Sequence, residues 1–94
     1  MEIRWSEKAS DDFVAIIQYI RRENPDAALR TARAIYQQLE QLKMFPNSGR
    51  PGRVDGTREI TFAPLPFIVV YRVKQSLIEI ARVLHGAQRW PQKS

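Results

Sequence analysis

Hydrophobic positions in the first half of the chain recur with the period of a helix. The first apolar stripe consists of Ala9, Phe13, Ile16, Ile17 and Ile20. This spacing predicts an amphipathic helix. Ser6 precedes the stripe, where its hydroxyl can accept a hydrogen bond from an unpaired amide of the first turn. Residues 2–5 alternate between apolar and polar side chains and indicate a short strand.

The dipeptide Asn24-Pro25 divides this helix from a second one. Proline pushes the residue before it out of the helical region and is itself well accepted at the first helical position. The second apolar stripe consists of Ala28, Ala32, Ile35, Leu39 and Leu42, and it stops before Phe45-Pro46. Because the connection is so short, we expect the two helices to be antiparallel neighbours that cover another surface.

After Pro46 the helical period disappears. Residues 46–56 are rich in proline, glycine and small polar residues, which predicts a loop. Three runs with strand-like patterns follow, at Thr57–Phe62, Phe67–Val73 and Leu77–Leu84, with connections short enough for hairpins. The sequence therefore predicts an α+β fold of order β-α-α-β-β-β, with the helical hairpin packed on a mostly antiparallel sheet. With 94 residues, we expect one domain over residues 1–94.

Charge is distributed unevenly along the chain. The net charge is +5, and all of it falls in residues 47–94, because residues 1–46 carry equal numbers of acidic and basic side chains. A basic second half favours an acidic or polyanionic partner, although the charge could also serve only solubility. The chain has no cysteine, no signal-peptide pattern and no long apolar run. We therefore expect a cytoplasmic protein without a membrane partner.

Three arginines interrupt the apolar faces of the predicted strands: Arg58, Arg72 and Arg82. In strictly alternating strands, Arg58 would share its face with Ile60 and Phe62, and Arg82 with Ile78, Ile80 and Leu84. An unpaired guanidinium is very costly to bury. Each of these arginines must therefore reach water, a ligand or a carboxylate such as that of Glu59 or Glu79.

Other candidate groups lie in the predicted loop and after the last strand. Arg50 and Arg53 stand in the loop and could clamp a phosphate group. His85 is the only histidine, and its side chain titrates closest to neutral pH, so it is the natural acid–base candidate. A structural role is the alternative for a single histidine. Because zinc, phosphate-loop and dinucleotide motifs are missing from the sequence, we expect no metal and no cofactor.

Short motifs follow one another in a characteristic order along nearly the whole chain. They are Trp5-Ser6, Asn24-Pro25, Phe45-Pro46, Gly49-Arg50, Gly56-Thr57-Arg58-Glu59-Ile60, Tyr71-Arg72-Val73, Arg82-Val83-Leu84-His85-Gly86 and Arg89-Trp90-Pro91. In this order they resemble the RelE/ParE superfamily of toxins from type II toxin–antitoxin modules. The resemblance implies a RelE/ParE-like fold and a toxin neutralised by a cognate antitoxin, which is small, acidic and partly disordered and folds onto the toxin.

The resemblance leaves two activities open. RelE-like members cut messenger RNA in the ribosome, in which case Arg58 and Arg82 would face the phosphate and His85 would assist acid–base catalysis. This chain departs from the best-studied RelE type, because arginines replace the loop lysines and Trp90 cannot transfer a proton. ParE-like members poison DNA gyrase and are not themselves enzymes.

The motif blocks around residues 56–60, 71–73 and 85–91 are more similar to the ParE branch. We therefore expect a gyrase poison, with a ribosome-dependent endoribonuclease as the alternative and a non-toxic nucleic-acid-binding module as a third possibility. The residues expected to contact the target are Arg50, Arg53, Arg58, Arg72, Arg82 and Arg89.

Overall fold

The computed structural model describes residues 1–86, 90 and 91. Its elements are β1 (Glu2–Trp5), α1 (Glu7–Glu23), α2 (Pro25–Met44), β2 (Arg50–Pro51), β3 (Arg58–Phe62), β4 (Leu65–Lys74) and β5 (Leu77–His85). Their order confirms the predicted succession of a strand, two helices and hairpin-connected strands. The segment predicted as a loop, however, contains the two-residue strand β2.

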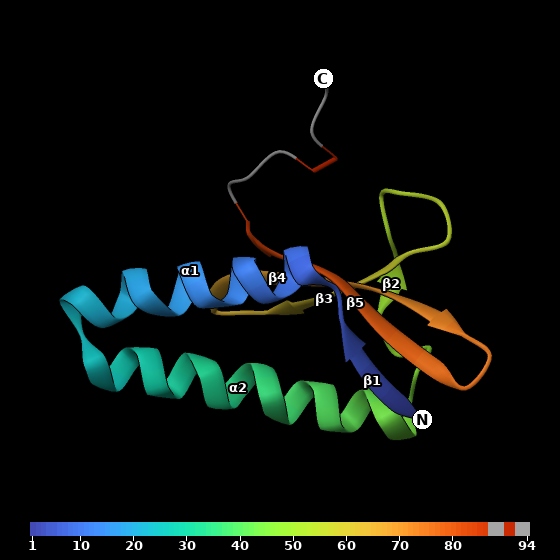
Figure 1. The fold of residues 1–94 in the computed structure, drawn as a ribbon, viewed down its shortest axis with the longest axis horizontal. Coiled ribbons are helices and arrows are strands. Elements are labelled where there is room, and N and C mark those ends of the chain that lie inside the picture. The colour runs from blue at the N-terminus through green and yellow to red at the C-terminus, as the bar shows by residue number, and fades with distance from the viewer. Residues whose placement is uncertain (87–89, 92–94) are drawn as a thin grey trace.

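The strands form one sheet in the order β1-β5-β4-β3-β2. β1 runs parallel to β5, whereas the other neighbours are antiparallel, so the sheet is mostly antiparallel as predicted. The two helices lie side by side as a hairpin and pack on the sheet (Figure 1). The chain is therefore an α+β fold with one face of the sheet covered by helices.

Local signals in the sequence explain where the helices begin and end. Ser6 Oγ accepts a hydrogen bond from the backbone amide of Ala9 at 3.0 Å, which confirms its predicted role as N-cap of α1. Asn24 ends α1 and also caps α2, because its Oδ1 accepts from the amide of Ala27 at 3.0 Å. Pro25 occupies the first turn of α2, where its missing amide costs nothing.

The core lies between the helix hairpin and the sheet. Its buried residues are Ala9, Ile35, Leu39, Leu42, Ile60, Val69, Tyr71, Ile78, Ile80 and Val83. The stripe of α2 is well covered, but in α1 Ala9 is buried whereas Phe13 and Ile16 are only partly buried. Part of the apolar face of α1 therefore remains accessible along one side of the hairpin.

A bulge in β5 changes which side chains face the helices. Tyr71 of β4 pairs with Ile80, whereas Val70 pairs with Arg82, so Ala81 is an extra residue in β5. An extra residue shifts the alternation of the strand by one. The prediction that Arg82 shares a face with Ile80 was therefore wrong. Arg82 lies in register with Val70, on the face directed away from the helices.

Candidate target-binding surface

The segment between α2 and β3, residues 46–57, is called the arginine loop below because it carries Arg50 and Arg53. On the helix side of the sheet, Tyr71 holds the first part of this loop in place through hydrogen bonds. The hydroxyl of Tyr71 accepts from the amide of Gly49 at 3.0 Å and donates to the carbonyl of Pro46 at 2.8 Å. A Cβ at Gly49 would lie 2.7 Å from the Tyr71 hydroxyl, so this contact requires glycine.

Arg58 fastens the same part of the arginine loop. It pairs with Tyr71 in the β3–β4 ladder, and its Nη1 donates to the carbonyls of Gly49 at 2.8 Å and Asn47 at 3.2 Å. Its guanidinium is thus directed to the protein's own backbone. The strand places Arg58 on the helix side with Ile60, as the alternating pattern predicted.

Glu59 fastens the second part of the arginine loop on the opposite side of the sheet. Its side chain is 1% exposed. Its carboxylate accepts from the amide of Arg53 at 2.9 Å, from Arg53 Nε at 3.2 Å and Nη2 at 3.3 Å, and from Arg50 Nη2 at 3.3 Å. The side chains of Arg50 and Arg53 remain 59% and 45% exposed. Glu59 was considered as a structural partner for strand arginines, but its actual partners come from the loop.

The ionisation of Glu59 follows from these contacts. Burial raises the pKa of its carboxyl group. The hydrogen bonds from the backbone and side chain of Arg53 and from Arg50 lower this pKa, and together they outweigh the effect of burial. The net pKa lies below the ordinary value for glutamate. Glu59 is therefore an anion at neutral pH, and two cations share it.

The tip of the arginine loop is closed by its own hydrogen bonds. Thr57 Oγ1 donates to the carbonyl of Val54 at 2.6 Å, and the amide of Gly52 donates to the carbonyl of Thr57 at 2.7 Å. Gly56 has a φ of 80°, a conformation that favours glycine. Figure 1 shows this loop projecting from the body next to β2.

Arg82 lies at the other end of the sheet and binds Asp12 of α1. Its Nε and Nη2 donate to the two carboxylate oxygens at 2.7 Å and 3.0 Å, and its side chain is 13% exposed. The hydrogen bond to Asp12 raises the pKa of Arg82. The ring of Trp90 lies 5.4 Å from the guanidinium carbon. Nothing local in the sequence connects Asp12 with residue 82, because the two residues are 70 positions apart.

By register, Arg72 and Arg82 both belong to the sheet face opposite Tyr71 and Ile80, although the guanidinium of Arg82 binds Asp12 of α1. Arg72 Nη1 lies 3.8 Å from Glu79, which confirms the structural partner considered from the sequence. Glu59, Val70 and Arg82 form one cross-strand row on this face. The face therefore gathers Arg72 and Arg82 together with the loop arginines held by Glu59. Arg89, also predicted to contact the target, lies outside the described residues.

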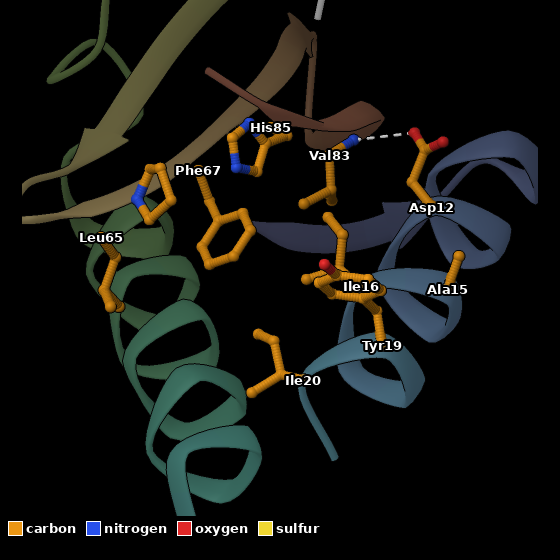
Figure 2. A pocket seen from close by; sticks show the side chains of 10 residues that line it. Asp12, Ala15, Ile16, Tyr19, Ile20, Leu65, Phe67, Val83 and His85 are labelled. Carbon is orange, nitrogen blue, oxygen red and sulfur yellow. Dashed lines mark hydrogen bonds between the residues drawn. The ribbon is translucent and has the colours of Figure 1, made fainter. Parts of the chain in front are cut away.

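His85 lies at the end of β5 and borders an apolar groove. Its ring stands edge-on to Phe67, with 5.8 Å between the ring centroids. The groove has a volume of about 590 Å³ and lies between α1 and the ends of β4 and β5 (Figure 2). Its lining comprises Asp12, Ala15, Ile16, Tyr19, Ile20, Leu65, Pro66, Phe67, Val83 and His85. Arg58, Arg82 and His85 thus have three different surroundings: loop carbonyls, the Asp12 carboxylate and the groove.

Two further findings concern residues 1–86, 90 and 91. Within this part of the chain, no three histidine, aspartate or glutamate side chains gather closely enough to hold a metal ion. Neither of its helices has the length and apolar character needed to cross a membrane.

A small cationic α+β domain with a helical hairpin on one sheet face has counterparts among toxin–antitoxin proteins. Residues 3–90 match the family described as ParE toxin of type II toxin-antitoxin system, parDE. The chain therefore belongs to the ParE toxin family and is a toxin of a type II toxin–antitoxin system.

Individual relatives agree with this assignment. The chain is 41% identical to toxin Y4kP of Sinorhizobium fredii, over 96% of this chain and 93% of that protein. It is 31% identical to toxin RelE2 of Caulobacter vibrioides, over 93% and 97% of the two chains. Among solved structures, a chain of the chromosomal ParDE toxin–antitoxin system from P. aeruginosa superposes with a TM-score of 0.80 at 32% identity, covering 90% of this chain and 95% of that one.

Proposed function

We propose that this toxin stops bacterial growth by acting on DNA gyrase and that it does so by binding rather than by catalysis. The observation that carries the proposal is how its strand arginines are used. An RNA-cleaving mechanism needs arginines aimed at a phosphate, whereas Arg58 donates to backbone carbonyls and Arg82 to Asp12. The side chains of Arg50 and Arg53 in the arginine loop, 59% and 45% exposed, are more accessible than those of Arg72 and Arg82. We propose that they contact the target, together with Arg72, Arg82, Arg58 and Arg89.

A ribosome-dependent endoribonuclease is the second candidate. It is favoured by His85, the only histidine of the sequence, which lies exposed at the end of β5, because histidine is the side chain most often used for general acid–base catalysis. In that mechanism His85 would move a proton while Arg58 and Arg82 stabilise the phosphate. The name of one relative, toxin RelE2, is consistent with this second candidate.

We also propose that a cognate antitoxin neutralises this toxin in the cytoplasm. The antitoxin would be small, acidic and partly disordered. A disordered segment must bury apolar surface to offset the entropy it loses on folding. The groove beside α1 supplies such a surface through Ile16, Ile20 and Phe67. Acidic residues of the same antitoxin would be attracted to a toxin with a net charge of +5.

Two parallel assays on the purified toxin distinguish the candidates. In the first, gyrase is incubated with plasmid DNA and ATP, and supercoiling and cleaved DNA are measured. In the second, translating ribosomes are incubated with the toxin, and cuts in the messenger RNA are mapped by primer extension. We expect loss of supercoiling or trapped cleavage in the first and intact RNA in the second. Ribosome-dependent cutting with normal gyrase activity would reverse the assignment.

Growth tests establish toxicity and its neutralisation separately. Induced expression of the toxin should stop growth, and co-expression of the small acidic protein encoded beside it should restore growth. Normal growth at a high soluble level of the toxin would contradict both proposals.

A further inference from the structure

Glu59 differs from the other acidic residues of the sheet in its burial and in its partners. Its carboxylate is almost fully shielded from solvent, at 1% exposure. Four hydrogen bonds reach it, and all four come from Arg50 and Arg53. The effect of this carboxylate is therefore concentrated on the arginine loop.

We propose that Glu59 is a positioning residue that fixes Arg50 and Arg53 as a binding site for phosphate groups of the nucleic acid in the target complex. The inference rests on the proposed function, since it assigns the part of the toxin that meets the DNA on which gyrase acts. Glu59 itself does not touch the nucleic acid. It acts through the two guanidinium groups that it holds.

The geometry leaves donors available for a ligand. Arg50 uses Nη2 to bind Glu59, and Arg53 uses Nε and Nη2. Within the described residues, the remaining N–H groups of both guanidiniums have no hydrogen-bond acceptor, and both side chains are about half exposed. Two guanidiniums held by one carboxylate must lie close together. Such a pair matches the several acceptor oxygens of a phosphate group.

The charge balance at this place also favours an anion. Residues 46–59 carry three arginines and two acidic residues, Asp55 and Glu59, so one net positive charge remains around the exposed guanidinium groups. Glu59 already restricts both arginine side chains before an anion binds. These side chains therefore lose less conformational entropy on binding than freely rotating arginines would.

Glu59 also holds the backbone amide of Arg53, but the other parts of the arginine loop have attachments of their own. Its first part is fastened by Tyr71 and Arg58, and its tip is closed through Thr57. Glu59→Gln keeps a side-chain oxygen that can still accept from the Arg53 amide, so it should release the two guanidinium groups while leaving the path of the loop in place. This separation makes the positioning role testable.

Nucleic acid fits this surface better than the antitoxin does. From the start of β2 onwards, the arginine loop exposes five residues: Arg50, Pro51, Arg53, Asp55 and Gly56. They offer little apolar area to a protein segment that must fold as it binds. A nucleic-acid backbone, in contrast, presents an ordered line of phosphates and gains affinity from released counterions.

The direction in which one substitution changes the affinity for DNA distinguishes a positioning role from simple charge attraction. Glu59→Gln raises the net charge of +5 by one unit and keeps every arginine. If positive charge alone attracted DNA, this variant would bind more tightly. If Glu59 positions the arginines, the variant binds more weakly despite its higher charge, by roughly fivefold to tenfold, as expected when an arginine side chain must be immobilised on binding.

The measurement is the affinity of the full toxin for a short DNA duplex across a series of salt concentrations, alone and with gyrase. Arg50→Ala and Arg53→Ala should each weaken binding and lower the salt slope by about one. Arg53→Lys keeps the charge but loses the forked contact with Glu59, so it should resemble Glu59→Gln. Arg4→Ala is the matched control, because Arg4 is exposed on β1 at the opposite edge of the sheet.

Each outcome has a defined meaning. Equal or tighter DNA binding by both Glu59→Gln and Arg53→Lys would overturn the proposal. Weakened antitoxin binding with unchanged DNA binding would also overturn it and would assign the loop to the antitoxin. If Glu59→Gln does not fold, Arg53→Lys decides. A wild-type toxin without any effect on gyrase would refute the proposed target, whereas DNA binding by the isolated toxin would still be measured independently.

Discussion

Asp12 and Arg82 join α1 to β5 through a forked ion pair between residues 70 positions apart. Arg82 Nε lies 2.7 Å from one carboxylate oxygen of Asp12, and Nη2 lies 3.0 Å from the other. The same carboxylate accepts the amide of Val83 at 3.0 Å. β1 pairs with residues 77–80 of β5, so Asp12 satisfies a backbone donor of β5 beyond the end of β1. The pair thus completes the sheet edge as well as neutralising an arginine.

Replacing Asp12 should destabilise the fold. Asp12→Ala leaves a mostly buried guanidinium and the Val83 amide without their acceptor. We expect a loss of about 2–3 kcal/mol in the free energy of unfolding, somewhat below the cost of breaking a fully buried pair because both side chains retain slight exposure. Urea denaturation measures this loss. Asp11→Ala, at the exposed neighbouring position, is the control and should change stability by less than about 0.5 kcal/mol.

Acid should weaken the toxin partly through Glu59. The pKa of this carboxyl group is lower in the folded protein than in the unfolded chain, where it is about 4.3. The stabilisation is therefore fully present above about pH 4.3 and is lost as the pH falls through the folded pKa. Melting temperatures measured between neutral and acidic pH should show a smaller acid-induced fall in Glu59→Gln than in the wild type. Parallel curves for the two proteins would contradict this assignment.

Local features of the fold could be predicted from the sequence, whereas contacts between distant segments could not. Ser6 and Asn24 cap helices through residues three positions away, so their roles follow from the nearby sequence. Arg82 was recognised as needing a partner, but the choice of Asp12 depends on how α1 packs beside β5. The burial of Glu59 likewise depends on the path of the arginine loop.

The strand boundaries show a related limit. One extra residue, Ala81, shifts the faces of β5, and no composition signal marks a bulge of this kind. β2 consists of Arg50 and Pro51 within a turn-rich segment, and proline is accepted there because β2 is an edge strand. Alternation alone therefore grouped Arg58 correctly with Ile60 but grouped Arg82 wrongly with Ile80.

A substitution at Gly49 should disturb the attachment of the arginine loop. The Cβ of Gly49→Ala would lie 2.7 Å from the hydroxyl of Tyr71 and 3.0 Å from the carbonyl of Glu59. One of these groups must move, and the hydrogen bond between the Gly49 amide and Tyr71 should weaken. We expect a loss of about 1–3 kcal/mol in unfolding free energy, measured by urea denaturation. Ser48→Ala, at the exposed preceding residue, should remain close to the wild type.

The groove beside α1 offers a separate test of antitoxin docking through Tyr19. Tyr19 is 70% exposed in the free toxin and lines the groove with Ile16 and Ile20 (Figure 2). An exposed aromatic side chain at the rim of an apolar groove is typical of a residue that becomes buried when a partner binds. Tyr19→Ala should therefore lower the affinity for the antitoxin by roughly tenfold or more, the effect of losing a side chain that dominates an interface.

Because Tyr19 is largely exposed, the same substitution should leave the free energy of unfolding of the toxin nearly unchanged. Leu29→Ala is the matched control, since Leu29 is 51% exposed on α2 and does not line this groove. Titration calorimetry with the purified antitoxin measures both variants. Equal affinities of Tyr19→Ala and the wild type would place the antitoxin elsewhere on the toxin. A loss confined to Tyr19→Ala, with gyrase inhibition by the free toxin unchanged, would locate neutralisation at the groove and separate it from the arginine face.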